Sequence, residues 1–181
     1  DTLVLGPNGL LGGHGTIAGS VDSGLGIVSP GLETASSGPG TVSVDGSIGT
    51  LTADTYTHSP GSTYVVETLA DGSSDQVAFT GVATLNGGRL QIVPLDHDGV
   101  DAYRGKTVDY TILTASSIME RPDGPLFDEV DAPVLLNASL HTERNGGSDH
   151  LKLTLTTRSI GDLARTGNEQ IVAAVLDQIY D

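Results

Sequence analysis

The sequence predicts an all-β fold, and among all-β folds it favours a solenoid. Short apolar strands, each closed by Gly, Asp or Asn, recur from the N-terminus to about Ser159. Strands are expected to start near Thr50, Thr63, Val77 and Arg89, a spacing of roughly a dozen residues that is typical of all-β proteins. A sandwich or a barrel also satisfies that spacing. Units of variable length and an aromatic content of only 4% favour a coil of thin stacked layers over two packed sheets.

The composition describes an ordered, turn-rich chain with a strong negative charge. Of 181 residues, 25 are Gly and 8 are Pro, below the share of about 25–30% that indicates disorder. The formal net charge of −15 repels phosphate backbones and anionic lipids, so we expect no nucleic-acid partner and no membrane-surface binding. The chain has no cysteine, hence no disulfides and no thiolate chemistry, which suits export through an oxidising periplasm. It contains neither a signal peptide nor a long apolar run, and we expect it to be a segment of a longer protein.

Residues 75–94 (DQVAFTGVATLNGGRLQIVP) carry the clearest strand signal. Apolar and polar residues alternate there, as they do along a half-buried strand. The apolar face takes Val77, Phe79, Ala83 and Leu85. After Asn86-Gly87-Gly88 the apolar parity changes, and Leu90 and Ile92 become the inward pair. Because Gly tolerates the positive φ that corners often need, the chain is expected to change direction at these glycines.

Other strands are predicted from shorter apolar runs. They are expected at residues 3–5, 17, 21, 27–28, 42–44, 51–56, 64–69, 108–116, 127–130, 134–140 and 151–155. Loops are expected at residues 32–40, at the acidic segment 95–105 and at the Pro-rich segment 119–126. Asn145-Gly146-Gly147 is typical of a hairpin turn between the last two strands.

The end of the chain changes to a helical pattern. Thr166-Gly167-Asn168-Glu169 fits the capping box that satisfies free amides at a helix start. Apolar residues then recur at helical spacing at Ile171, Val172, Val175, Leu176 and Ile179. We therefore predict an amphipathic helix over residues 167–180 that covers the last layer of strands.

These pieces, in this order, resemble the C-terminal part of the passenger of a bacterial autotransporter, a type V secretion protein. The family's glycine-punctuated repeat is resembled by GTIAGSVDSGLGIVSPG, and its β-strand region by GTLTADTYTHSPGSTYVVETLADGSSDQVAFTGVATLNGGRLQIV. The autochaperone segment is resembled by VDYTILTAS, Phe127 and LKLTLTTRS, and the helix before the membrane barrel by TGNEQIVAAVLDQI. The resemblance implies a right-handed parallel β-helix with a C-terminal capping hairpin and one short amphipathic helix. It divides the chain into β-helix rungs (1–94), an autochaperone cap (95–159), and a linker with a helix (160–181).

The resemblance also implies a function without catalysis and without a cofactor. The segment would nucleate β-helix folding as an intramolecular chaperone while the passenger is exported to the bacterial cell surface. Its partners would be the preceding rungs of the same chain and the C-terminal membrane barrel of the full-length protein. An open strand edge can direct the pairing of the next strand, which gives this function a physical basis. We expect it to depend on the stability that buried residues supply, namely Val77, Phe79, Leu85, Leu90, Ile92, Tyr110, Ile112, Leu113, Phe127, Leu151, Leu153 and Leu155.

Two other functions stay open at this point. In the first, the segment is an adhesin that binds a host or cell-surface ligand through the acidic loops 95–105 and 117–131. In the second, it is a β-helix enzyme acting on polysaccharide. That enzyme requires carboxylates clustered in a groove, and no pair stands at a convincing spacing in the sequence.

Local motifs give little support for a metal or catalytic site. Residues 12–20 (GGHGTIAGS) begin like a calcium-binding repeat, but Ile17 occupies the position of the ligating Asp. Asp96-His97-Asp98 is the most site-like cluster, as a metal site, a general base or a solvated loop. Calcium binding or plain solvation also stays open for the acids Asp123, Asp128, Glu129 and Asp131. No metal-ligand spacing relates the histidines His14, His58, His97, His141 and His150.

Overall fold

The structure is a computed structural model that describes residues 1–31 and 47–180. The predicted loop at 32–40 and the predicted strand at 42–44 lie outside the described residues. The described part is mostly β, with parallel sheets and one α-helix, and is compatible with the solenoid-like fold that the sequence predicts. Within these residues no helix has the length and apolar character needed to cross a membrane.

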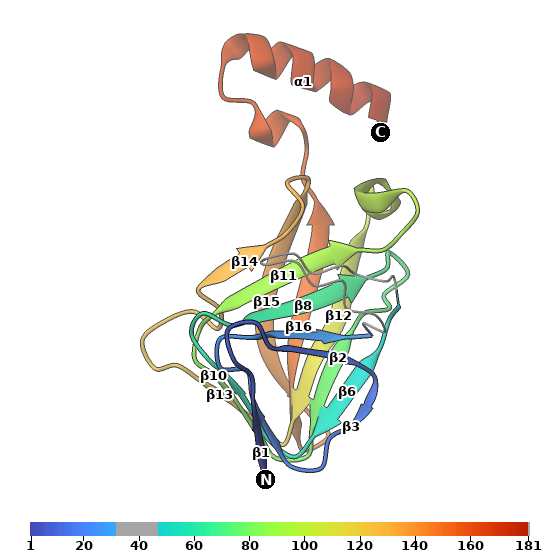
Figure 1. Cartoon of the computed structure of the whole chain (residues 1–181). Helices are drawn as coiled ribbons and strands as arrows, with labels where there is room; N and C mark the ends of the chain where they lie inside the picture. The colour runs from blue at the N-terminus through green and yellow to red at the C-terminus, as the bar shows by residue number, and fades with distance from the viewer. Residues whose placement is uncertain (32–46, 181) are drawn as a thin grey trace.

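The strands form three sheets (Figure 1). The first sheet contains β1 (Thr2–Val4), β4 (Ser20–Asp22), β7 (Tyr56–His58), β10 (Val82–Leu85) and β13 (Ser117–Glu120). The second contains β2 (Leu10–Gly13), β5 (Ile27–Pro30), β8 (Thr63–Thr68), β11 (Arg89–Pro94) and β14 (Glu129–Asp131). The third contains β3 (Gly15–Thr16), β6 (Thr50–Ala53), β9 (Gln76–Phe79), β12 (Thr107–Ala115), β16 (Ser148–Thr157) and β15 (Leu136–Asn145).

Consecutive strands visit the three sheets in turn, so each strand pairs with the strand three places along the chain. These pairings are parallel, and only those of β12 with β16 and of β16 with β15 are antiparallel. Inward side chains of equivalent positions therefore stack: Val28 pairs with Tyr64, which pairs with Leu90. In the third sheet Leu51 pairs with Val77, which pairs with Leu113. One buried cluster of such residues runs from Leu5 to Leu155.

The central stretch is divided differently from the prediction. Residues 76–85 are not one strand, because Thr80 and Gly81 form a corner that places β9 and β10 in different sheets. Their amides donate to the carbonyls of Ala53 and Asp54 in the corner below. Apolar residues alternate on both sides of this corner, so its position leaves no trace in the period. The expected corner after Leu85 is confirmed, since Gly87 and Gly88 have φ values of 108° and 79°.

Several other predicted boundaries also move. The strand expected at 51–56 is two strands, β6 and β7, which lie in different sheets. The acidic loop 95–105 contains a short 3-10 helix, η1 (Gly99–Tyr103), that buries Tyr103. Met119 belongs to β13 rather than to the Pro-rich loop, and Phe127 and Val134 precede β14 and β15 rather than lying in them.

The predicted hairpin is confirmed. Asn145 pairs with Ser148 across a two-residue turn in which Gly146 and Gly147 have φ values of 60° and 90°. Such turns need positive φ at both central residues, which glycine adopts without strain. In β12 the pairing register shifts between Thr111 and Leu113, and this bulge lets Ile112 and Leu113 both be buried.

The predicted helix is confirmed as α1 (Gly167–Tyr180). In its capping box, the amide of Thr166 donates to Oε2 of Glu169 at 2.9 Å, and the amide of Glu169 donates to Oγ1 of Thr166 at 3.3 Å. The expected cover over the last strands is wrong for the described side chains. Ile171 and Val172 are 68% and 58% exposed. The helix stands away from the sheets and packs mainly on η2 (Gly161–Leu163) (Figure 1).

Candidate functional site

The C-terminal end of the stack is closed by the C-terminal hairpin, meaning β15 and β16. β16 lies between β12 and β15, and its inward residues face those of β12. The facing pairs are Leu151 with Leu113, Leu153 with Tyr110, and Leu155 with Val108. The three leucines of β16 are each 0% exposed. From β15, Leu136 is also buried, and Ala138 and Leu140 pack against the same core.

Two tyrosines fasten this block to the strands before it. The Tyr64 hydroxyl donates to the carbonyl of Ile112 at 2.6 Å, and the Tyr110 hydroxyl donates to the carbonyl of Leu69 at 2.9 Å. Burial raises the pKa of both hydroxyls well above the ordinary value of 10.0. Both groups therefore stay protonated and keep donating at any physiological pH.

The residues predicted to form the folding core lie together. All of them are buried and belong to one hydrophobic cluster: Val77, Phe79, Leu85, Leu90, Ile92, Tyr110, Ile112, Leu113, Phe127, Leu151, Leu153 and Leu155. Sequence reasoning did not single out Tyr56, Tyr103 and His58, which are also fully or nearly fully buried. For Tyr56 and His58 a usable signal exists, because a spacing of two along a strand places both on the inward face.

His58 is the centre of a buried polar group. Its ring is 0% exposed, and Nδ1 lies 2.8 Å from the Tyr56 hydroxyl and 3.2 Å from Oγ of Ser62. The edge of the ring meets Phe127, with centroids 5.1 Å apart. Burial lowers the pKa of His58 to about 4, so the imidazole is neutral at physiological pH.

Aspartates fasten corners of successive layers. Oδ2 of Asp128 accepts from the amide of Gly88 at 2.8 Å, and its other oxygen accepts from Arg121 at 2.8 Å. Oδ2 of Asp149 accepts from the amide of Ile118 at 2.9 Å. These amide donors are the main reason that the pKa of each carboxyl lies below its ordinary value of 3.8.

The opposite end of the stack is open. Its three edge strands, β1, β2 and β3, are called the N-terminal edge below, and each pairs with another described strand on one side only. Their sequences are TLV, LLGG and GT, without a charge or a proline. Leu3 and Val4 are 41% and 62% exposed. This edge therefore lacks the devices with which proteins usually protect a sheet edge from further pairing.

The clusters considered for metal or acid–base chemistry are engaged in other contacts. Asp96 accepts from the amide of Ala70 at 2.8 Å, and His97 is exposed. Arg89 pairs with Glu129 at 3.4 Å and with Asp131 at 2.9 Å. In residues 1–31 and 47–180, no group of three or more His, Asp or Glu side chains is arranged to hold a metal ion.

The remaining histidines and the glycine repeat also lie apart from one another. His14 and His141 are exposed, and His150 lies 3.3 Å from the carbonyl of Asn145. Residues 12–20 span β2, β3 and the turns that follow them, with positive φ at Gly13, Gly15 and Gly19. Both observations describe local backbone structure rather than a ligand site.

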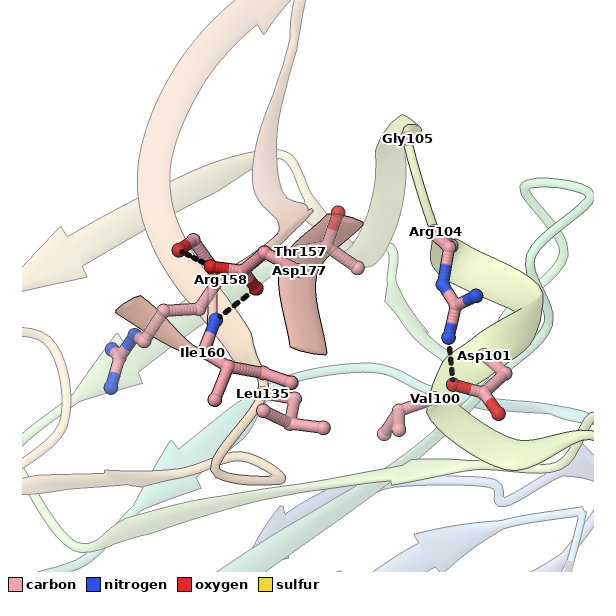
Figure 2. A pocket seen from close by; sticks show the side chains of 10 residues that line it. Val100, Asp101, Arg104, Gly105, Leu135, Thr157, Arg158, Ile160 and Asp177 are labelled. Carbon is pink, nitrogen blue, oxygen red and sulfur yellow. Dashed lines mark hydrogen bonds and ion pairs between the residues drawn. The ribbon is translucent and has the colours of Figure 1, made fainter. Parts of the chain in front are cut away.

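A pocket of about 710 Å³ lies between η1 and the linker that leads to α1 (Figure 2). Val100 faces Leu135 and Ile160 across it. On the rim, Asp101 pairs with Arg104 at 3.0 Å, and Asp177 accepts from the amide of Ile160 at 2.8 Å. The lining residues include neither His nor Cys, and both carboxylates are held by donors.

No family model matches the chain, and the search of curated proteins gives no significant match, so neither comparison identifies a family.

Proposed function

We propose that this chain is the C-terminal segment of an exported passenger protein and that its last strands act as an intramolecular folding nucleus. In this proposal, the three sheets are the walls of a right-handed parallel β-helix, the C-terminal hairpin is its cap, and preceding rungs are added at the N-terminal edge. The resemblance to autotransporter passengers supports this proposal and implies a bacterial cell-surface location, with no catalysis and no cofactor.

The observation that carries the proposal is the difference between the two ends. The C-terminal edge strands β13, β14 and β15 carry the charged residues Glu120, Glu129, Asp131, Glu143 and Arg144. Charges on an edge discourage further pairing. The N-terminal edge has none, so growth is favoured in one direction only.

The packing energy has the size that such a nucleus needs. Leu151, Leu153 and Leu155 are each 0% exposed, and full burial of a leucine contributes about 1.5–3 kcal/mol before entropy is subtracted. Contacts in a stacked chain are mostly between neighbouring layers, so folding can propagate from a stable block. Outside the cell there is no ATP, and in our proposal this stacking free energy opposes backward sliding of the chain.

The proposal is tested in a full-length passenger by deleting residues 108–159 and adding the segment back as a separate chain. We expect the deletion to leave the passenger poorly secreted or sensitive to protease, and the added segment to restore part of the resistance. Normal protease resistance of the deleted passenger contradicts the proposal.

A pair of point variants refines this test. Leu153→Asp places a charge in the buried core of β16, whereas Thr156→Asp places the same charge on the outer face of the same strand. We expect only Leu153→Asp to reduce protease resistance. Equal effects of both variants contradict a role for core packing.

Adhesion through the acidic loops stays a prediction. Asp101, Asp128, Glu129 and Asp131 already pair with arginines of the same chain, which reduces what they can offer to a ligand. Ligand binding by the segment that is lost on loop substitution, with folding unchanged, would favour this alternative.

A further inference from the structure

We infer that the N-terminal edge is also a self-association surface, on which a second copy of this chain docks with two-fold symmetry when no preceding strand occupies it. The inference needs only the order and chemistry of the described strands. It therefore stands or falls separately from the folding function proposed above.

The backbone of the N-terminal edge offers a row of hydrogen-bonding groups. β1 pairs with β4, β2 with β5 and β3 with β6, which leaves the other side of each edge strand without a described strand partner. Unpaired strand edges of this kind pair readily with another chain.

The hydrophobic core also reaches the surface at this end. Leu3 stacks on Val21 and Leu11 stacks on Val28, so both leucines belong to the last layer of the inward side chains. Val21 and Val28 are 3% and 1% exposed, whereas Leu3 is 41% exposed. A further layer laid on this end buries the leucine surface that its own chain leaves in contact with water.

A two-fold axis through β2 satisfies all three edge strands at once. It places β2 antiparallel to β2 of the second copy, and β1 of each copy opposite β3 of the other. Each surface then contacts its own counterpart, which is the usual arrangement of homodimers. Both N-terminal edges are consumed, so the assembly closes at two copies and does not extend into a fibre.

The charge distribution favours a second copy at this surface over any other contact between copies. A net charge of −15 makes most approaches of two copies repulsive. The N-terminal edge strands hold no charged residue, whereas the opposite edge carries Glu120, Glu129 and Asp131. Salt screens the remaining repulsion, so association strengthens as ionic strength rises.

The first test is sedimentation equilibrium of the whole chain over a wide range of concentration and at two salt concentrations. We expect a monomer–dimer equilibrium that shifts towards dimer in higher salt. The double variant Val4→Lys/Thr16→Lys changes exposed residues of β1 and β3, which face each other in the dimer. Four lysines then meet at the interface, and we expect dimer affinity to fall by about tenfold or more.

The matched control is Val130→Lys, which adds a lysine to a 40% exposed valine of the opposite edge strand β14. We expect it to leave the association constant unchanged. A wild-type chain that stays monomeric at every concentration overturns the inference. So does a dimer that tolerates Val4→Lys/Thr16→Lys, or one that Val130→Lys weakens equally.

A second test uses the absence of native cysteine. Val4→Cys and Thr16→Cys chains are mixed and oxidised, and the products are separated by mass. Two-fold pairing of β1 with β3 predicts that the mixed disulfide forms faster than either symmetric disulfide. Preference for the symmetric products overturns the arrangement, whatever the sedimentation result.

Discussion

At the scale of single residues, His58 makes stability depend on pH. Its folded pKa of about 4 lies below the ordinary value of 6.5, so the unfolded chain binds the additional proton first as pH falls. The stability that the neutral ring contributes is complete above pH 6.5 and is lost as pH falls from 6.5 to 4. Between pH 7 and pH 5 we expect the free energy of unfolding to fall by about 2 kcal/mol from this residue alone.

The measurement is urea unfolding at several pH values for the wild type and for His58→Gln. The amide of Gln does not titrate in this range, so the variant is less stable overall but loses the additional slope between pH 6.5 and 4. Carboxylates such as Asp128, whose pKa is lowered mainly by the Gly88 amide, contribute only near and below the ordinary value of 3.8. An unchanged slope in the variant means that His58 is not the group that titrates.

Gly88 is the residue at which the backbone leaves no room for a side chain. A Cβ there lies 2.8 Å from Nε2 of His58 and 2.9 Å from the carbonyl oxygen of Ser59, and φ is +79°. We expect Gly88→Ala to destabilise the chain by roughly 2 kcal/mol or more, because it adds a clash to backbone strain. Gly72→Ala is the matched control, since Gly72 has φ +97° and open space around it. A loss in Gly88→Ala no larger than the loss of about 1 kcal/mol expected for Gly72→Ala removes the role of the clash.

At the scale of elements, the C-terminal hairpin is expected to dominate stability. Leu153→Ala removes a side chain that is 0% exposed and leaves a cavity beside Tyr110, at a cost of about 2–5 kcal/mol. Thr156→Ala on the outer face of the same strand is expected to change stability by less than about 0.5 kcal/mol. Chemical unfolding of both variants measures the difference, and similar losses contradict a core role for the hairpin.

Elements with strong local signals could be predicted from the sequence. The hairpin turn at Asn145-Gly146-Gly147, the capping box of α1 and the parity change at Gly87-Gly88 all rest on chemistry within a few residues. The corner at Thr80-Gly81 could not be predicted, because the inward residues keep a period of two on both sides of it. The cover expected from α1 is wrong because helical period fixes which residues share a face, not what that face meets.

At the scale of the whole molecule, the burial of the predicted core could be read from alternation, but the contrast between the two ends could not. An apolar residue such as Leu3 reads like Val21, yet one ends a stack and the other lies inside it. His58 was missed for a similar reason, since a lone histidine in a strand gives no sign of the tyrosine and phenylalanine that enclose it. Such features depend on which strands become neighbours, and that is a property of the assembled sheets.

The central claim is that the C-terminal block is the most stable part of the chain, and native-state hydrogen exchange tests it most directly. The comparison is between the amides of β12 and β16 and those of β4 and β5, which are also paired on both sides. We predict that amides of β12 and β16 exchange only through global unfolding, while β4 and β5 exchange through openings of lower free energy. If the amides of β4 and β5 outlast those of β12 and β16, the C-terminal strands are not the nucleus.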